Sequence, residues 1–400
     1  MNSTEGLSDQ ENVAFTAEPN KTVTQNFHFH GSGSEYFRIW IVNLLLTLIT
    51  LGIYSAWAKV RRMQYFYENT ELMGARFGYH ADPKKVLKGR LLAILAVGGF
   101  YAAAYFFPVI EPFGSVIWVA LLPALLALAL YFRLRNTSYR GLRFEFDGTF
   151  RHSYQALRLP LAMALIGLAA VAIAMQYIGE SGKTSMLIGI VLAVVYLLLP
   201  IIVIPMFQVQ WKRFAHEHSL FGTERFGFTA TVKQYSKTYW SSFLLFILVL
   251  LPAAIAFVWV TAYLFGDMYR SRGPFSWWNK LPEIILIISI LYVMLFAIAP
   301  YLKAKFFNLA WNNTQIGKHS FVADVPVWGL VGVVASNFAL ILLTLGFYRP
   351  FAVIRTQKYL LTHLHLNTAG EPADIFKTSN TSGANTVSEG ALDLFGDMDM

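Results

Sequence analysis

Long apolar runs alternate with polar, basic segments along most of this chain. Eight of these runs are long enough to be membrane helices, at approximately residues 37–57, 91–110, 114–131, 159–178, 186–208, 242–265, 281–302 and 327–349. About 20 consecutive apolar residues match the hydrocarbon thickness of a bilayer. A spanning segment must satisfy its own backbone hydrogen bonds, and runs this continuous are not typical of barrel strands. The pattern therefore predicts an all-α membrane protein with about eight transmembrane helices.

Basic residues orient these spans. Most of the 32 Lys and Arg lie in the connections that follow the first, third, fifth and seventh runs. The alternate connections contain only Lys183, Arg270, Arg272 and Lys280. Cytoplasmic loops of membrane proteins retain Lys and Arg, so the four basic connections are predicted to face the cytoplasm.

The basic residues at the C-terminal end of the chain conflict with eight full crossings. Eight crossings place both termini outside, yet Arg349, Arg355 and Lys358 follow the last apolar run. The alternative is that the first and last runs are re-entrant or lie in the interface, which leaves six crossings and both termini inside. Eight spans are the preferred interpretation.

Composition limits the class of protein and the partners that can be expected. The chain is 56% hydrophobic and 14% charged, which is too apolar for a soluble domain. Its net charge is +9, and the basic residues lie beside the predicted membrane segments. Anionic phospholipid headgroups are therefore expected partners, and nucleic acid is not. Three regions are predicted: a polar N-terminal segment (1–35), a multi-pass transmembrane domain (36–366) and a disordered acidic tail (367–400).

The first and last apolar runs resemble each other. Seven positions of the first run recur in the last at one constant offset: Asn43, Thr50, Leu51, Gly52, Tyr54, Arg61 and Tyr65 correspond to Asn337, Thr344, Leu345, Gly346, Tyr348, Arg355 and Tyr359. We therefore expect both segments to share one conformation, a helix that breaks at Thr-Leu-Gly and continues as an amphipathic basic-aromatic stretch.

A second repeat occupies the basic connections. In each, an Asn or a similar residue precedes a Phe by eight positions, with a Gly between them. The instances are Asn69–Gly74–Phe77, Asn136–Gly141–Phe144, His218–Gly222–Phe226 and Asn313–Gly317–Phe321. The pattern indicates an amphipathic helix, a glycine turn that admits positive φ, and a short extended piece. The four units are expected to contribute short cytoplasmic β segments that could pair as a small sheet.

These features resemble the YjgN-like family of bacterial inner-membrane proteins, a domain family of unknown function. The resemblance is carried by the segments at 29–33, 35–37 and 50–57, by Arg62 and Tyr65, and by Asn69-Thr70. It covers about residues 27–366. Ala56 stands where the family usually has Pro before the Trp, although Pro350 precedes Phe351 in the second copy. The resemblance implies a multi-pass protein of the bacterial inner membrane and supplies no catalytic residues.

Candidate catalytic and metal motifs are weak. Gly182-Lys183-Thr184 lacks the earlier Gly and the preceding strand of a phosphate loop, so a short turn outside the membrane is the better interpretation. Three His-x-His pairs, at 28/30, 216/218 and 363/365, offer two ligands each, which is too few for a closed metal site. We therefore expect no enzymatic activity, no metal and no cofactor.

The middle of every predicted span lacks acidic and basic residues, and its most polar side chains are amides and hydroxyls. The candidate intramembrane polar site consists of Asn43, Thr50, Gly52, Tyr54, Asn337, Thr344, Gly346 and Tyr348. Hydrogen bonding between helices is the simpler role for such groups. The functional alternative is that the broken helices frame a substrate site, as in transporters with inverted repeats.

Two functional hypotheses remain from the sequence. The first is a transporter or channel for a small solute or lipid. The second is a non-enzymatic membrane scaffold or envelope-organising protein that acts through its cytoplasmic loops.

Overall fold

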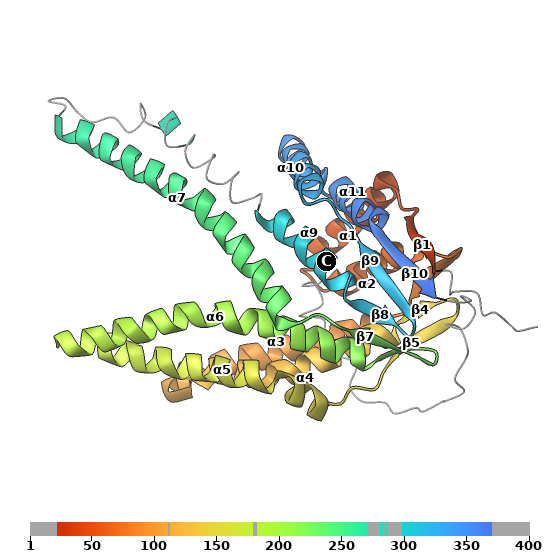
Figure 1. The fold of residues 1–400 in the computed structure, drawn as a ribbon, viewed down its shortest axis with the longest axis horizontal. Coiled ribbons are helices and arrows are strands. Elements are labelled where there is room, and N and C mark those ends of the chain that lie inside the picture. The colour runs from red at the N-terminus through yellow and green to blue at the C-terminus, as the bar shows by residue number, and fades with distance from the viewer. Residues whose placement is uncertain are drawn as a thin grey trace, which may run out of the picture.

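The computed structural model describes residues 22–110, 113–178, 182–270, 281–282, 285 and 298–369. A closed β-barrel lies at one end of the molecule, and long helices extend from it in one direction (Figure 1). The predicted tail from residue 370 onward and most of the predicted span 281–302 lie outside the described residues.

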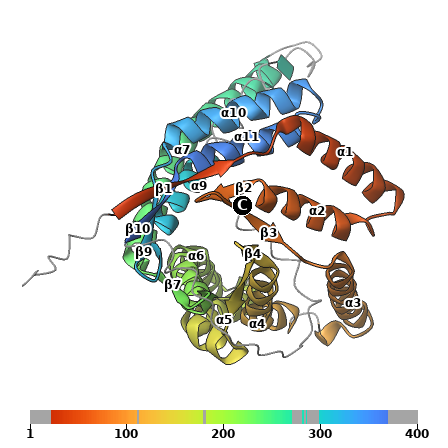
Figure 2. The same ribbon diagram turned by 90° about the vertical axis from the view of Figure 1, so that its right-hand side faces the viewer.

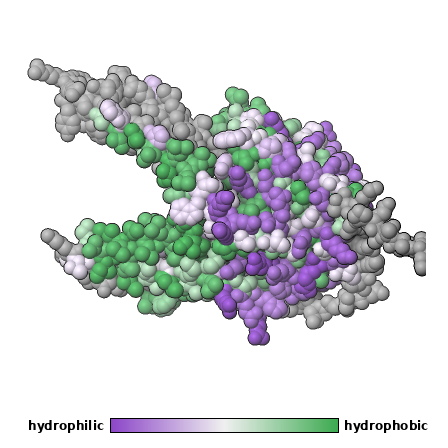
Figure 3. All heavy atoms as spheres, viewed as in Figure 1, coloured by the Kyte–Doolittle hydropathy of each residue, from purple (hydrophilic) through white to green (hydrophobic). Residues whose placement is uncertain are grey.

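Four of the described helices are long and apolar enough to cross a membrane. They are α3 (Pro83–Phe106), α4 (Phe113–Arg135), α5 (Phe150–Ile178) and α6 (Lys183–Glu217). A short 3₁₀ turn, η1 (Pro108–Ile110), follows α3. In Figure 3 the protruding parts of these helices are apolar, whereas hydrophilic residues collect over the barrel end. The boundary between the two colours lies where the helices leave the barrel end.

Two further helices connect this bundle to the rest of the barrel. Helix α7 (Val232–Arg270) diverges from α6 as it leaves the barrel (Figure 1). Helix α9 (Ile298–Trp311) leads back to the barrel strands.

The basic connections fold into short strands, as the repeated loops predicted, but these strands close a barrel, which corrects the prediction of an all-α fold with a small sheet. Ten antiparallel strands close a barrel in the order β1-β10-β9-β8-β7-β6-β5-β4-β3-β2. Their bounds are β1 Thr22–Phe29, β2 Thr70–Leu72, β3 Ala75–Tyr79, β4 Thr137–Tyr139, β5 Leu142–Phe146, β6 Ser219–Phe221, β7 Glu224–Phe228, β8 Thr314–Ile316, β9 His319–Ala323 and β10 Leu364–Ala369. Closure pairs every strand on both sides and leaves no free edge.

The repeated Asn ends each helix and starts each β-hairpin. The Nδ2 atoms of Asn69, Asn136 and Asn313 donate to the carbonyl oxygens four residues earlier, at 2.8, 2.7 and 2.8 Å. Their own carbonyls accept from the backbone N–H groups of His30, His80 and Thr229 at 2.9, 2.8 and 2.9 Å. The Asn therefore satisfies a helix carbonyl that would otherwise lack a donor, and joins neighbouring units.

The repeated Gly makes the hairpin turn. Gly74, Gly141, Gly222 and Gly317 all have positive φ, between 51° and 80°. Met73 and Arg140, which precede two of them, also have positive φ, as a type I′ turn requires. A Cβ at these glycines would be strained, so the turn chemistry fixes where each two-residue loop falls.

The repeated Phe fills the barrel. Phe77, Phe144, Phe226 and Phe321 belong to one hydrophobic cluster that takes side chains from all ten strands. Phe221 lies within it, with ring centroids 4.7 Å from Phe144 and 5.9 Å from Tyr139. The barrel interior is therefore a packed core in the described residues and not a pore.

The first and last predicted spans are helical hairpins, which corrects the preferred interpretation of eight crossings. The first hairpin comprises α1 (Gly33–Ile49), a turn, and α2 (Ser55–Glu68); the second comprises α10 (Val327–Leu343), a turn, and α11 (Arg349–Thr362). In Figure 2, α3–α6 are seen nearly end-on while all four hairpin helices are seen lengthwise. The hairpins therefore run across the direction of the spans, as helices lying in a membrane interface do.

Both hairpins begin and end at the barrel. His30 N donates to Asn69 O at 2.9 Å, and Asp324 N donates to His363 O at 3.2 Å. Each pair joins the chain just before a hairpin to the chain just after it. A hydropathy pattern cannot separate such a hairpin from a crossing, because an apolar 17-residue helix has the composition of either.

The predicted N-terminal segment 1–35 is also divided by the structure. Residues Thr22–Phe29 form β1, which pairs with β2 and with β10 from the other end of the chain. Both described ends of the chain therefore lie at the barrel, as the alternative with re-entrant or interfacial end segments requires.

Cysteine labelling tests this topology without removal of native residues, because the chain contains no cysteine. A membrane-impermeant maleimide added to intact spheroplasts should label Thr184→Cys, at the start of α6, and should not label Thr24→Cys on β1 or Glu145→Cys on β5. After lysis all three should react, since all three positions are exposed. Labelling of Thr24→Cys from outside would restore the eight-crossing topology.

A cationic pocket between two helical hairpins

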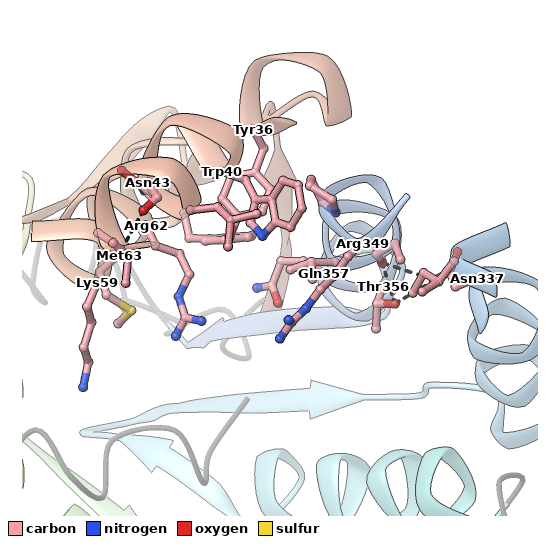
Figure 4. A pocket seen from close by; sticks show the side chains of 18 of the residues that line it. Tyr36, Trp40, Asn43, Lys59, Arg62, Met63, Asn337, Arg349, Thr356 and Gln357 are labelled. Atoms are coloured by element: carbon pink, nitrogen blue, oxygen red, sulfur yellow. Dashed lines mark hydrogen bonds between the residues drawn. The ribbon is translucent and has the colours of Figure 1, made fainter. Parts of the chain in front are cut away.

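A pocket of about 750 Å³ lies between the two hairpins (Figure 4). The first hairpin lines it with residues that include Tyr36, Trp40, Asn43, Lys59 and Arg62; the second contributes Val334, Asn337, Phe338, Ile341, Arg349, Val353, Thr356 and Gln357, among others. Arg90 of α3 and Lys303 of α9 complete the charged part. In the close-up, Lys59 and Arg62 lie on one side of Trp40, and Arg349 and Gln357 on the other.

Corresponding faces of the two hairpins form the walls. Asn43 and Asn337, which occupy equivalent positions, both line the pocket, as do Ala58 and Ala352. The same holds for the pairs Trp40/Val334, Leu44/Phe338, Thr47/Ile341, Ser55/Arg349, Lys59/Val353, Arg62/Thr356 and Met63/Gln357. The structure thus brings the predicted residues Asn43 and Asn337 to one cavity, although they come from opposite ends of the chain.

Charge in the lining is of one sign. Five basic side chains line the pocket: Lys59, Arg62, Arg90, Lys303 and Arg349. No Asp or Glu lines it in the described part of the chain. Burial lowers the pKa of Lys303, which directly follows the predicted span 281–302. A lysine that is costly to keep charged favours a bound anion, because an opposite charge nearby stabilises the ammonium form.

Tyr36 lines the same pocket as these cations. Burial raises the pKa of its hydroxyl, and the charges of Arg62 and Arg349 oppose that rise. Arg62 of the first hairpin and Arg349 of the second line the same pocket as this tyrosine.

The two equivalent asparagines differ in their hydrogen bonds. Asn337 donates through Nδ2 to Ala352 O at 3.2 Å and to Thr356 Oγ1 at 3.1 Å, and its Oδ1 accepts from Arg355 at 3.3 Å. Asn43 Oδ1 is buried and accepts no hydrogen bond within the described chain. The second hairpin is therefore tied together internally at a position where the first hairpin leaves an acceptor unused.

The other residues of the predicted polar site lie at the hairpin turns and do not line the pocket. Thr50 Oγ1 donates to Leu46 O at 2.7 Å and accepts from Tyr54 N at 2.9 Å; Thr344 makes the same two bonds, with Leu340 and Tyr348, at 2.7 and 2.9 Å. Gly52 and Gly346 have φ of 93° and 95°. These residues make both turns the same, and their role here is structural.

The repeated loop residues do not reach the pocket either. Asn69, Gly74, Phe77, Asn136, Gly141, Phe144, Gly222, Phe226, Asn313, Gly317 and Phe321 build the barrel. The cations of the pocket were not predicted as a group. One signal was available, because Lys59 and Arg62 are three residues apart and so share a helix face.

The two hairpins approach each other closely at Gly33. A Cβ added at Gly33 would collide with the ring of Phe351, which also packs against Phe37 with centroids 5.8 Å apart. Gly33→Ala should therefore push α11 from α1 and lower stability by about 1–3 kcal/mol, the usual cost of overpacking. The thermal unfolding midpoint in detergent measures this.

Gly332→Ala is the matched control, because nothing lies within 4 Å of a Cβ at Gly332 on α10. That change should be neutral or slightly stabilising, since Ala favours a helix over Gly by up to about 1 kcal/mol. Equal destabilisation by both changes would contradict the tight contact at Gly33.

Comparisons with known proteins agree with the membrane fold. Relatives in the curated proteins include the inner membrane protein YjgN of Salmonella typhimurium (strain LT2), 26% identical over 355 residues, which are 85% of this chain and 87% of the relative. The YjgN proteins of Escherichia coli O157:H7 and strain K12 are 34% and 32% identical over 179 and 176 residues, 42% of this chain and 43% of each relative. No solved structure matches this chain.

The inner-membrane location follows from these relatives together with the candidate spans. A family model described as "Bacterial protein of unknown function (DUF898)" matches residues 24–394. The match includes the barrel, the spans and both hairpins. The chain therefore belongs to this family of bacterial proteins of unknown function.

Proposed function

We propose that this protein is a non-enzymatic lipid transporter of the inner membrane, which takes the headgroup of an anionic phospholipid into the pocket between its two hairpins. The observation that carries the proposal is the lining of that pocket: five basic residues, no lining carboxylate among the described residues, and apolar side chains beside them. Phosphate and several cations attract strongly where water is partly excluded.

The hairpins suit a ligand that is half polar and half apolar. Helices α1 and α10 are apolar, whereas α2 and α11 carry Lys59, Arg62 and Arg349. The turns expose large apolar side chains, with Leu51 93% and Leu345 89% exposed. Amphipathic elements of this kind lie at the boundary between headgroups and acyl chains. The pocket is thus at the depth where a phospholipid presents its phosphate.

We place the barrel on the cytoplasmic side. The connections that carry most of the Lys and Arg are the ones that form the barrel strands, and the positive-inside rule assigns them to the cytoplasm. The ligand would then come from the cytoplasmic leaflet, where anionic lipids and basic segments attract each other.

We further propose that the two hairpins are copies of one unit. Their turns have the same φ values and hydrogen bonds, and nine pairs of equivalent residues line the pocket. A substrate site between two copies of one unit is a common arrangement in transporters.

The other hypotheses have less support. A channel through the barrel is disfavoured because its interior is packed with aromatic side chains. A scaffold that adds a partner strand is disfavoured because the ten strands leave no free edge. Enzymatic chemistry is disfavoured because no His, Asp or Glu lines the pocket in the described residues, so it lacks the usual general bases.

The test uses purified protein in two assays. Binding of radiolabelled phosphatidylglycerol in detergent should saturate at a fixed stoichiometry, whereas phosphatidylcholine should compete poorly. Proteoliposomes should move fluorescent phosphatidylglycerol between leaflets faster than protein-free liposomes. Equal binding of both lipids would refute recognition of an anionic headgroup, and binding without movement would refute transport.

A further inference from the structure

We infer that the pocket holds its lipid in one orientation, with the phosphate on the hydroxyl of Tyr36 and an acyl chain along the face of α10 formed by Val334, Phe338 and Ile341. This inference rests on the proposed function and assigns each half of the ligand to one half of the pocket. It follows from three observations: the hydrogen-bonding state of Tyr36, the differences between equivalent positions of the hairpins, and the spacing of apolar residues on α10.

Tyr36 is a buried polar side chain whose hydroxyl has no hydrogen-bond partner within the described chain. Its side chain lines the pocket and the residue is only 4% exposed. Two aromatic contacts fix the ring, with centroids 5.4 Å from Tyr65 and 5.1 Å from Phe66. The ring is therefore positioned in advance, and a phosphate oxygen can accept from its O–H while the arginines nearby neutralise the anion.

Equivalent positions of the two hairpins differ in polarity, and most differences have the same direction. Tyr36, Lys59 and Arg62 of the first hairpin correspond to Leu330, Val353 and Thr356 of the second. Trp40 and Thr47 correspond to Val334 and Ile341. Apart from Arg349, which acts on Tyr36, the second hairpin thus offers mainly apolar or neutral side chains. A single amphiphile fits such a pocket in only one direction.

The apolar residues of α10 form a continuous face. Val334, Phe338 and Ile341 are four and three residues apart, which places them on one side of a helix. At about 1.5 Å per residue they extend roughly 10 Å along it, enough for part of an acyl chain. All three line the pocket, and the face continues toward the exposed apolar turn at Leu345.

Removal of the Tyr36 hydroxyl tests the phosphate half. Tyr36→Phe keeps the ring contacts and should weaken phosphatidylglycerol binding about tenfold, in the range expected for one hydrogen bond to a charged group. Tyr105→Phe, at an exposed position of α3, should have no effect. Unchanged affinity in Tyr36→Phe, with the wild-type protein still binding the lipid, would overturn the role of Tyr36 and leave the proposed function standing.

Photo-crosslinking tests the chain half. Phosphatidylglycerol with a diazirine at the end of an acyl chain should label peptides of α10, whereas an analogue with a photoreactive headgroup should label α1 and α2. The reverse labelling would overturn the orientation. Failure of the wild-type protein to bind any phosphatidylglycerol would overturn the proposed function as well.

A binding measurement with soluble glycerophosphate distinguishes a lipid site from a site for free phosphate compounds. Ile341→Trp should fill the chain path, weaken phosphatidylglycerol binding at least fivefold and leave glycerophosphate binding unchanged. Glycerophosphate that binds the wild-type protein as tightly as phosphatidylglycerol would show that α10 holds no chain, and so would overturn the inference.

Discussion

Replacing Arg62 and Arg349 together with glutamine should reduce the binding of phosphatidylglycerol by roughly a hundredfold. Each arginine comes from a different hairpin, and both line the pocket together with Tyr36. A hydrogen bond to a charged group contributes about 1.5–3 kcal/mol, and Arg349 is exposed, so the low end of that range applies. About 1.4 kcal/mol corresponds to tenfold in affinity, hence about tenfold for each side chain. Equilibrium binding of radiolabelled lipid measures the loss.

The control for this variant removes the same charge elsewhere. Arg76 on β3 and Arg143 on β5 are exposed on the barrel, so Arg76→Gln with Arg143→Gln lowers the net charge equally without touching the pocket. This variant should bind almost as the wild-type protein does. If both variants lost affinity to the same extent, net charge and not the pocket would determine binding.

Phe221→Ala should destabilise the barrel by about 3–5 kcal/mol, the usual cost of removing a large aromatic side chain from a core. Phe221 is only 2% exposed and contacts the rings of Tyr139 and Phe144. Because these rings come from three consecutive strands, β4, β5 and β6, the cavity would be shared between two repeated units. The variant should show a lower thermal midpoint in detergent and faster proteolysis within the barrel strands.

Val322→Ala on β9 is the matched control for a change in a barrel strand. Val322 points outward between the buried residues Phe321 and Ala323, and is 36% exposed. Its truncation should shift the midpoint little. A midpoint for Phe221→Ala equal to that of Val322→Ala would contradict the packed interior and would reopen the question of a pore.

The features that follow from local chemistry could be predicted from the sequence. Spans α3–α6 are each at least 23 residues long and strongly apolar over most of that length, so length and composition identify them. Each repeated loop was predicted to contain a helix, a glycine turn with positive φ and a short extended piece, and the structure has a helix, such a turn and a short strand at these places. These features depend on residues close together in the sequence, so they can be predicted without knowledge of the tertiary structure.

Closure of the barrel could not be predicted in the same way. Strands of three residues, such as β2 and β4, are too short to show a period of two. The pairing of β1 with β10 joins residues from opposite ends of the chain, for which no local pattern exists. The hairpins were predicted as crossings because hydropathy records length and composition but not direction; the basic residues after position 348 were the only contrary signal.

The sequence placed Asn43 and Asn337 at equivalent positions of the first and last runs, and both line one cavity in the structure. Its cations come from four helices, α2, α3, α9 and α11, whose relative positions depend on the barrel. The residues of such a site are far apart in the sequence, so no local pattern predicts that they form one pocket.

Joining β1 to β10 has a consequence for synthesis on the ribosome. The N-terminal strand can pair with β2 as soon as the first hairpin has emerged, but its other edge stays open until β10 has been made. The second wall of the pocket is made equally late, since α10 and α11 directly precede β10. A nascent or prematurely terminated chain would therefore insert its spans yet present an unsealed edge to membrane proteases, and it would acquire ligand affinity only when translation is nearly complete.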